Sequence, residues 1–203
     1  SKAIKNLVRD GVEIIDLGGE STRPGSHEIS YEVEKERVVK YLEFLSKTNH
    51  GAIISVDTRK SKIAELSAHF KAHIINDVSA GTFDEGMLAI VEKYKMGFCI
   101  CHSVGTPETM NINPKYENVV LDVYDYLEER IFKAVQAGIS KDKILVDPGI
   151  GFGKTCKHNL DIIRNISIFH GLGCPILLGV SRKKFIKTTM LSTNDLGLKF
   201  GSI

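Results

Sequence analysis

The chain has 203 residues, of which 42% are hydrophobic and 26% are charged, and its formal net charge at pH 7 is +2. This length and composition suit one globular domain and exclude a disordered chain. The mild charge, with Lys and Arg mixed among Asp and Glu, argues against a nucleic-acid surface. Its apolar runs are only strand-length and no charged-then-apolar leader opens it, so we expect no membrane span, no secretory signal and a cytoplasmic location.

The predicted elements alternate along the chain. A helical fragment opens it at residues 2–9. Apolar strands are expected near residues 12–17, 52–57, 72–77, 97–102, 143–147 and 175–180. Helical periodicity covers the segments between them, at 31–47, 60–70, 85–94, 117–137 and 158–169. Apolar strands alternating with amphipathic helices are typical of a parallel sheet covered by helices, which predicts the α/β class.

Polar residues end nearly every predicted strand, as Asp, Asn, His or a Ser-Arg-Lys run. In an open doubly wound sheet only a few strand ends form the site, whereas in a (β/α)8 barrel every strand end faces one mouth. The sequence therefore favours a (β/α)8 TIM barrel with about six of its eight strands in this chain. We expect a single barrel domain over residues 1–203, truncated at both ends.

The four cysteines are Cys99, Cys101, Cys156 and Cys174. They form no CxxC pair and have no His/Cys ligand spacing, so neither structural zinc nor a disulfide framework is indicated. We expect reduced thiols.

A glycine-rich segment, residues 147–154, follows the fifth predicted strand. A Walker A loop needs Gly six residues before its Lys, but Pro148 stands six residues before Lys154. The dinucleotide fingerprint fails too, because its third glycine would fall at position 154. The glycines can instead bring the backbone and Phe152 close to a flat ligand held by Asp147. The alternative is a tight turn in which Asp147 caps a helix.

Four polar side chains at strand ends are expected to converge, namely Asp57, Asn76, Asp147 and Lys183. Two carboxylates, an amide and an ammonium can together read a heteroaromatic edge that carries both N–H donors and O or N acceptors.

A second theme is anion binding. The loop at residues 18–25 carries Arg23, whose planar fork suits phosphate or carboxylate, although a solvated turn is the alternative. A basic run at residues 182–184 follows the last predicted strand. Because late loops of barrels commonly hold phosphate, we expect a negatively charged group on the substrate.

Six motifs in order resemble one family, dihydropteroate synthase, the folate-pathway enzyme of the pterin-binding barrel superfamily. The motifs are GGESTRPG at 18–25, SVDT at 55–58, IINDVSAG at 74–81, CHSVGTPETM at 101–110, DPGIGFGKT at 147–155 and GVSRKKFI at 179–186. The resemblance runs from Ile14 to about Ile186.

The resemblance implies roles for particular residues. The pterin ring would be bound by Asp57, Asn76, Asp147 and Lys183. The p-aminobenzoate side would be lined by Thr22, Pro24 and Ser181. Phe152 would form a wall of the cleft, Cys101 occupies a pterin-pocket position that is often Met in the family, and Arg23 would lie near the departing pyrophosphate. For His102, a hydrogen-bonded structural role and a catalytic one both stay open.

The reaction so implied joins 6-hydroxymethyl-7,8-dihydropterin diphosphate to p-aminobenzoate and releases pyrophosphate and 7,8-dihydropteroate. No side-chain nucleophile is needed, since the pterin delocalises the positive charge of an SN1-like step. Asp57, Asp147 and Lys183 would be the catalytic residues, the two carboxylates acting as fixed negative charge. The resemblance also implies Mg²⁺ as cofactor, small-molecule partners only, a homodimer and a sulfonamide target.

The departures from the family pattern are at the ends of the chain. Family members begin with a strand whose Asn helps to place magnesium and finish with a strand carrying Arg and His. This chain opens at Ser1 in a helix, and residues 191–203 show neither Arg nor His. The metal ligands are therefore unknown, and we expect a fragment or a truncated protein. Two alternatives remain: an inactive pterin-binding homologue and a methyltetrahydrofolate methyltransferase of the same superfamily.

Overall fold

The computed structural model describes residues 2–23, 25–48, 51–110, 112, 114–181, 183 and 186. Within them a parallel sheet has the order β1-β2-β3-β4-β5. The strands are β1 (Ile14–Gly18), β2 (Ile53–Asp57), β3 (Ile74–Asp77), β4 (Gly97–Cys101) and β5 (Ile144–Asp147). The helices are α1 (Lys2–Arg9), α2 (Tyr31–Ser46), α3 (Ser61–His69), α4 (Met87–Lys93), α5 (Val119–Gln136) and α6 (Cys156–Arg164). Two 3₁₀ segments, η1 (Lys141–Lys143) and η2 (Ile166–Leu172), flank β5 and α6.

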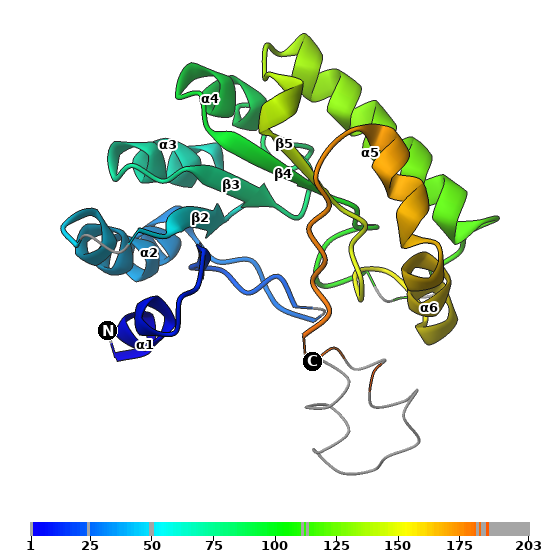
Figure 1. Ribbon diagram of the computed structural model, residues 1–203, viewed down its shortest axis with the longest axis horizontal. Helices are drawn as coiled ribbons and strands as arrows, with labels where there is room; N and C mark the ends of the chain where they lie inside the picture. The colour runs from blue at the N-terminus through cyan, green and yellow to red at the C-terminus, as the bar shows by residue number, and fades with distance from the viewer. Residues whose placement is uncertain are drawn as a thin grey trace.

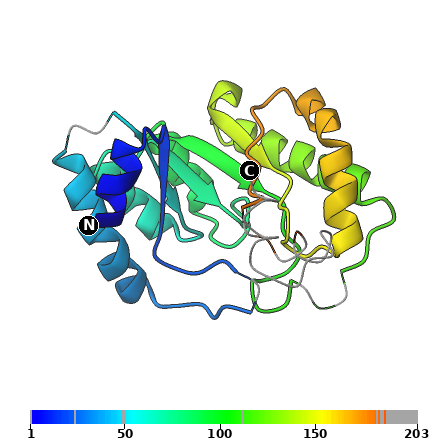
Figure 2. The ribbon, with the colours of Figure 1, turned by 60° about the horizontal axis from the view of Figure 1, so that its bottom comes forward.

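The sheet is curved, and the helices lie along its convex side (Figure 1). Strand order equals chain order, so each crossover carries the chain to the adjacent strand. Figure 2 shows the long loops after β1 and β4 gathered on one side of the sheet. The predicted parallel α/β arrangement is confirmed, and the carboxyl ends of the strands share one edge.

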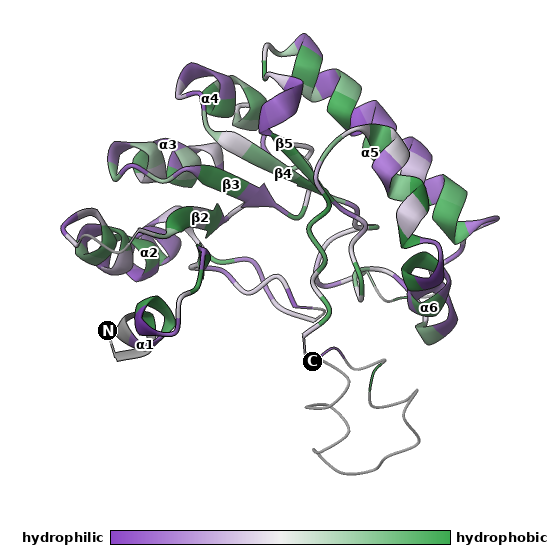
Figure 3. Cartoon of the chain, in the orientation of Figure 1, coloured by the Kyte–Doolittle hydropathy of each residue, from purple (hydrophilic) through white to green (hydrophobic). Residues whose placement is uncertain are grey.

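Residues alternate between the two faces of the sheet because successive side chains of a strand point to opposite sides. The helix-facing set is buried and apolar, and includes Ile15, Ile54, Val56, Ile75, Phe98, Ile100, Ile144 and Val146. Burying such a side chain stabilises the fold by roughly 1.5–3 kcal/mol. The other face carries mostly polar groups toward the carboxyl ends, and Figure 3 shows hydrophilic colour at the end of β3.

Local capping explains where the helices begin. Ser30 accepts from the backbone N–H of Val33 and starts α2 at the residue expected. Thr155 accepts from the N–H of His158, whose ring accepts in turn from the N–H of Thr155. This capping box begins α6 two residues before the predicted start, and the predicted 158–169 helix ends at Arg164, with η2 following.

The sixth predicted strand is represented by one isolated parallel bridge between Val146 and Ile176. Val146 donates to the carbonyl of Pro175 and accepts from Leu177. Among the described residues no strand lies beyond this segment, so its ladder has a partner on one side only. In the part of the chain that the structure describes, no helix combines the length and apolar character needed to cross a membrane.

Candidate functional site

Strand register brings the predicted pterin-reading residues to one edge. Gly18 of β1 pairs with Asp57 of β2, and Asp57 pairs with Asn76 of β3. On the other half of the sheet, Cys101 of β4 is the register partner of Asp147 of β5. The site is therefore built on rigid strand ends.

Asp57 is half-buried and has one side-chain bond, in which Thr22 Oγ1 donates to its Oδ2 over 3.4 Å. Burial raises the pKa of Asp57 well above its usual range, and the nearby charges of Asp16 and Asp77 raise it further. The structure gives this carboxyl no cation partner among the described residues. A cationic or N–H-rich ligand would relieve that cost.

Asn76 owes its orientation to a residue that sequence reasoning passed over. Its Nδ2 donates to Oδ2 of Asp16 over 3.1 Å. An ionised carboxylate can only accept, so the amide turns its NH₂ toward Asp16 and leaves its oxygen for a ligand. The available signal was spacing: Asp16 lies two residues before Gly18 on β1, hence on the same face.

Asp147 is 7% exposed, and its Oδ1 accepts from the N–H of Gly149 at 2.7 Å. Burial raises its pKa, whereas the Gly149 bond and the charges of Lys183 and Lys154 oppose that rise. The alternative of a helix-capping Asp147 is wrong, because the cap of α6 is Thr155.

Lys183 lies over the ring of Phe152, with Nζ 4.3 Å from the ring centroid. Burial lowers the pKa of Lys183, while the charge of Asp147 raises it and that of Arg23 lowers it. The cation–π contact gives the ammonium a defined place beside Asp147. The influence of Arg23 also brings the first loop within electrostatic reach of Lys183.

The predicted anion-binding residues are less gathered. Arg23 and Ser181 are exposed, and Thr22 reaches Asp57. Pro24, and residues 182 and 184 of the basic run, lie outside the described residues. The loop after β1 (the first loop) does contact the loop after β4, since the N–H of Gly25 donates to the carbonyl of Pro107 at 2.7 Å.

Cys101 is 2% exposed, and its Sγ lies 3.8 Å from the backbone oxygen of His102. Burial raises the pKa of this thiol well above its usual range, so the thiol is neutral. All four cysteines are reduced thiols, as expected.

Lys154 and His102 form a buried pair that the sequence did not predict. Lys154 is 6% exposed and its Nζ lies 2.8 Å from Nδ1 of His102. Burial, with the charge of Lys154, lowers the pKa of His102 to about 3. A histidine that stays neutral and accepts from a lysine fits the structural role better than an acid–base one.

A second buried network supports the first loop. Lys60 of the β2–α3 junction donates to Glu20 at 2.7 Å and to Glu34 of α2 at 2.8 Å. Arg59 also pairs with Glu20, and Thr58 donates to Glu34 at 2.7 Å. These bonds hold the end of β1, the start of the first loop and α2 together.

The structure shows no ligand set for the predicted magnesium ion in the part of the chain that it describes. No three His, Cys, Asp or Glu side chains there are grouped to hold an ion. Asp16, one of the carboxylates at the strand ends, is already bound by the amide of Asn76. These residues do not fit a magnesium centre by themselves.

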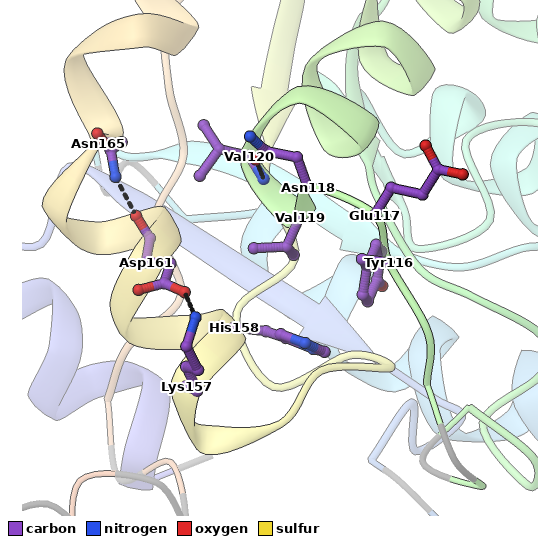
Figure 4. Close-up of a pocket in the computed structure, with 9 residues that line it drawn as sticks. All are labelled: Tyr116, Glu117, Asn118, Val119, Val120, Lys157, His158, Asp161 and Asn165. Carbon is purple, nitrogen blue, oxygen red and sulfur yellow. Dashed lines mark hydrogen bonds and ion pairs between the residues drawn. The ribbon is translucent and has the colours of Figure 1, made fainter.

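A pocket of about 380 Å³ lies outside the strand-end cluster, between the start of α5 and α6 (Figure 4). The residues that line it are Tyr116, Glu117, Asn118, Val119, Val120, Lys157, His158, Asp161 and Asn165. None is a predicted site residue. Its link to the site is Tyr116, whose hydroxyl donates to the carbonyl of Gly153 at 2.8 Å.

Comparison with known proteins agrees with this geometry. The profile of the family described as "Pterin binding enzyme" matches residues 1–199. The dihydropteroate synthase of Escherichia coli strain K12 is 41% identical over 180 residues, which cover 89% of this chain and 63% of that protein. That of Clostridium beijerinckii is 39% identical over 185 residues, covering 91% and 66%.

Solved structures give the same result. A Xanthomonas albilineans dihydropteroate synthase with 4-aminobenzoic acid superposes with a TM-score of 0.91 at 34% identity, covering 99% of this chain and 71% of that one. A Yersinia pestis dihydropteroate synthase in a sulfonamide drug complex gives 0.89 at 35% identity, covering 94% and 69%. The chain thus spans 63% of the length of the Escherichia coli relative. With a (β/α)8 TIM-barrel fold, represented here by a curved parallel sheet, it belongs to the pterin binding enzyme family.

Proposed function

We propose that this protein is a dihydropteroate synthase, a transferase of folate biosynthesis. It would condense 6-hydroxymethyl-7,8-dihydropterin diphosphate with p-aminobenzoate to give 7,8-dihydropteroate and pyrophosphate. The observation that carries the proposal is the buried Asp147 beside Lys183 and Phe152, in a chain of the pterin-binding family.

Binding of the pterin follows from the free hydrogen-bonding capacity of the site. Oδ1 of Asp147 is bound to the N–H of Gly149, so its other oxygen remains to accept from the amino-pyrimidinone edge. The oxygen of Asn76 is available in the same way, because its NH₂ is bound by Asp16. Lys183 donates to ring acceptors and Phe152 covers a face of the flat ring. Cys101 lines the pocket.

The chemistry needs charge stabilisation more than a nucleophile. As pyrophosphate leaves, positive charge develops on the pterin and is delocalised over the ring. Asp57 and Asp147 hold negative charge near it without reorganising, which stabilises the transition state more than the ground state. The arylamine then attacks the exocyclic carbon, and positioning of the two substrates supplies the rest of the acceleration.

The p-aminobenzoate side is assigned to Thr22, Pro24 and Ser181, with Arg23 taking the pyrophosphate. The hydrogen bond from Thr22 to Asp57 supports this, since it places the first loop beside one of the proposed pterin-binding residues. Sulfonamides, as p-aminobenzoate mimics, would compete there.

Several further properties remain proposals. The family resemblance suggests Mg²⁺, a homodimer and one domain over residues 1–203. The described residues do not gather the ligands that a magnesium ion needs. A cytoplasmic location, with small molecules rather than nucleic acid or membrane as partners, is likewise a prediction.

The test separates the proposed synthase from its alternatives. Pyrophosphate release is measured with both substrates, and binding of the pterin diphosphate is measured alone. A synthase releases pyrophosphate only when p-aminobenzoate is present. An inactive homologue binds the pterin without release, and a methyltransferase instead demethylates methyltetrahydrofolate. Either of the last two results would overturn the proposal.

A further inference from the structure

Lys154 binds backbone oxygens at both ends of the glycine loop (residues 149–153). Its Nζ lies 3.0 Å from the carbonyl oxygen of Gly149 and 3.0 Å from that of Phe152. It also contacts His102, at 2.8 Å from Nδ1 and 3.4 Å from the carbonyl oxygen. One buried ammonium thus joins the two ends of the loop to the end of β4.

The two carbonyls belong to Gly149 and Phe152, the loop residues that contact Asp147 and Lys183 of the proposed pterin site. Gly149 donates its N–H to Asp147, and Phe152 lies under the ammonium of Lys183. The loop packs tightly there: a Cβ built on Gly149 would lie 1.8 Å from the carbonyl oxygen of His102. A shift of either end would therefore move a pterin-binding group.

We propose that Lys154 is a positioning residue of the pterin site, whose ammonium fixes the glycine loop against β4 and so sets the places of Asp147 and Phe152. The proposal rests on the proposed function, and it assigns Lys154 no contact with substrate. It explains why a lysine is buried among neutral acceptors: the charge strengthens each bond to a carbonyl.

The role depends on the charge of Lys154, which gives it a pH signature. Burial lowers the pKa of Lys154 to about 7. The groups that face it are His102, Cys101, Asp147, Lys183 and His158. As pH rises through 7 the ammonium loses one of its three N–H donors and its charge, so its hold on the loop weakens.

The experiment compares Lys154→Met with the wild type. Methionine keeps much of the volume but donates nothing to the carbonyls. We expect the Kd for 6-hydroxymethyl-7,8-dihydropterin diphosphate, measured by calorimetry at pH 6, to rise about tenfold or more. The KM for p-aminobenzoate should change less than about threefold, since the first loop is untouched.

The pH dependence isolates Lys154 from the other titrating groups, because both proteins retain them. The ratio of the two dissociation constants should fall severalfold between pH 6 and pH 9, toward one. Lys157→Met is the matched control: this lysine is 82% exposed, pairs with Asp161 on α6, and should leave both constants unchanged. Should Lys154→Met not fold, judged by thermal unfolding, Lys154→Gln removes the charge while keeping two donors.

Asp147→Asn, measured in parallel, distinguishes the two proposals. If wild type does not bind the pterin diphosphate, or Asp147→Asn binds it equally well, the proposed function fails. If Asp147→Asn loses binding while folded Lys154→Met or Lys154→Gln keeps it within about twofold at pH 6, only the role of Lys154 is overturned. Equal losses for pterin and p-aminobenzoate, or a ratio independent of pH, would also overturn it.

Discussion

Two lysines at the same edge of the sheet, the partly buried Lys60 and the buried Lys154, are stabilised in opposite ways. Burial lowers the pKa of Lys60, but its bonds to Glu20 and Glu34 have the larger combined effect and raise the pKa above its usual 10.5. Lys154 has neutral oxygens and a neutral imidazole as direct partners, and burial lowers its pKa to about 7. A buried charge that is paired with an opposite charge is typical of a structural network. A buried charge without such a pair has a shifted pKa, which is more typical of a functional site.

The carboxylates follow the same division. Burial raises the pKa of Glu20, but hydrogen bonds from Ile29, Lys60 and Arg59 bring it below its usual value. For Asp57 and Asp147 burial prevails, and the pKa stays raised. The charges around Lys60 are thus balanced within the protein, whereas those of Asp57 and Asp147 are balanced only in part.

The largest effect on this comparison is expected from Gly149→Ala. Gly149 has φ +71, and its Cβ would meet the carbonyl oxygen of His102 at 1.8 Å, so either the loop or β4 must move. We expect the free energy of unfolding to fall by more than about 3 kcal/mol, measured by urea unfolding, with loss of pterin binding. Gly11→Ala is the control, because its φ is +76 and nothing lies within 4 Å. That variant should cost only about 1 kcal/mol; equal costs would contradict the account.

Asp147→Asn should act on function alone. The amide oxygen can still accept from Gly149, so the loop keeps its bond while the fixed negative charge disappears. Turnover, followed as dihydropteroate formation, should fall by about 100-fold or more. The thermal unfolding midpoint should not decrease. Near-normal turnover would refute the assignment of Asp147.

Glu34→Gln should do the reverse and weaken the scaffold. Its side chain is 1% exposed and carries one of the two carboxylates that bind Lys60. We expect about 2 kcal/mol less stability in urea unfolding. Turnover per folded molecule should be unchanged. Glu65→Gln, which breaks an exposed pair with Lys93, should leave unfolding essentially unaltered. A loss of turnover in folded Glu34→Gln would show that the two regions are not independent.

The smallest effect is a pH dependence of stability. The folded-state pKa of Lys154, about 7, lies below its usual 10.5, so between these values the unfolded chain binds more protons and stability rises with pH. This contributes about 1 kcal/mol between pH 7 and pH 8. Lys154→Met should lack the increment. Lys60 contributes no such slope there, because its raised pKa keeps its stabilisation constant until the pH exceeds 10.5.

Sequence patterns were sufficient to predict the strand–helix order and the common edge that carries Asp57, Asn76 and Asp147. Strands joined by helical crossovers run parallel, so their carboxyl ends lie at the same edge of the sheet. Sequence patterns could not reveal the setting of Lys154, since backbone carbonyls bind it and any residue supplies those. The partner of Asn76 was missed for a related reason: Asp16 comes from a strand two positions away in the sheet. Capping moved the start of α6, and the sixth predicted strand forms only an isolated bridge.

Because successive side chains of a strand point to opposite faces of the sheet, the number of residues in each strand is constrained as strictly as their identity. Val146 packs against the helices while its neighbour Asp147 faces the site. One residue inserted into β5 would exchange the two, placing a carboxylate in the apolar core and a valine among the polar strand-end residues. Insertions that this protein can accept therefore belong in its connecting loops, and an insertion scan across β5 should show no tolerated position between Ile144 and Asp147.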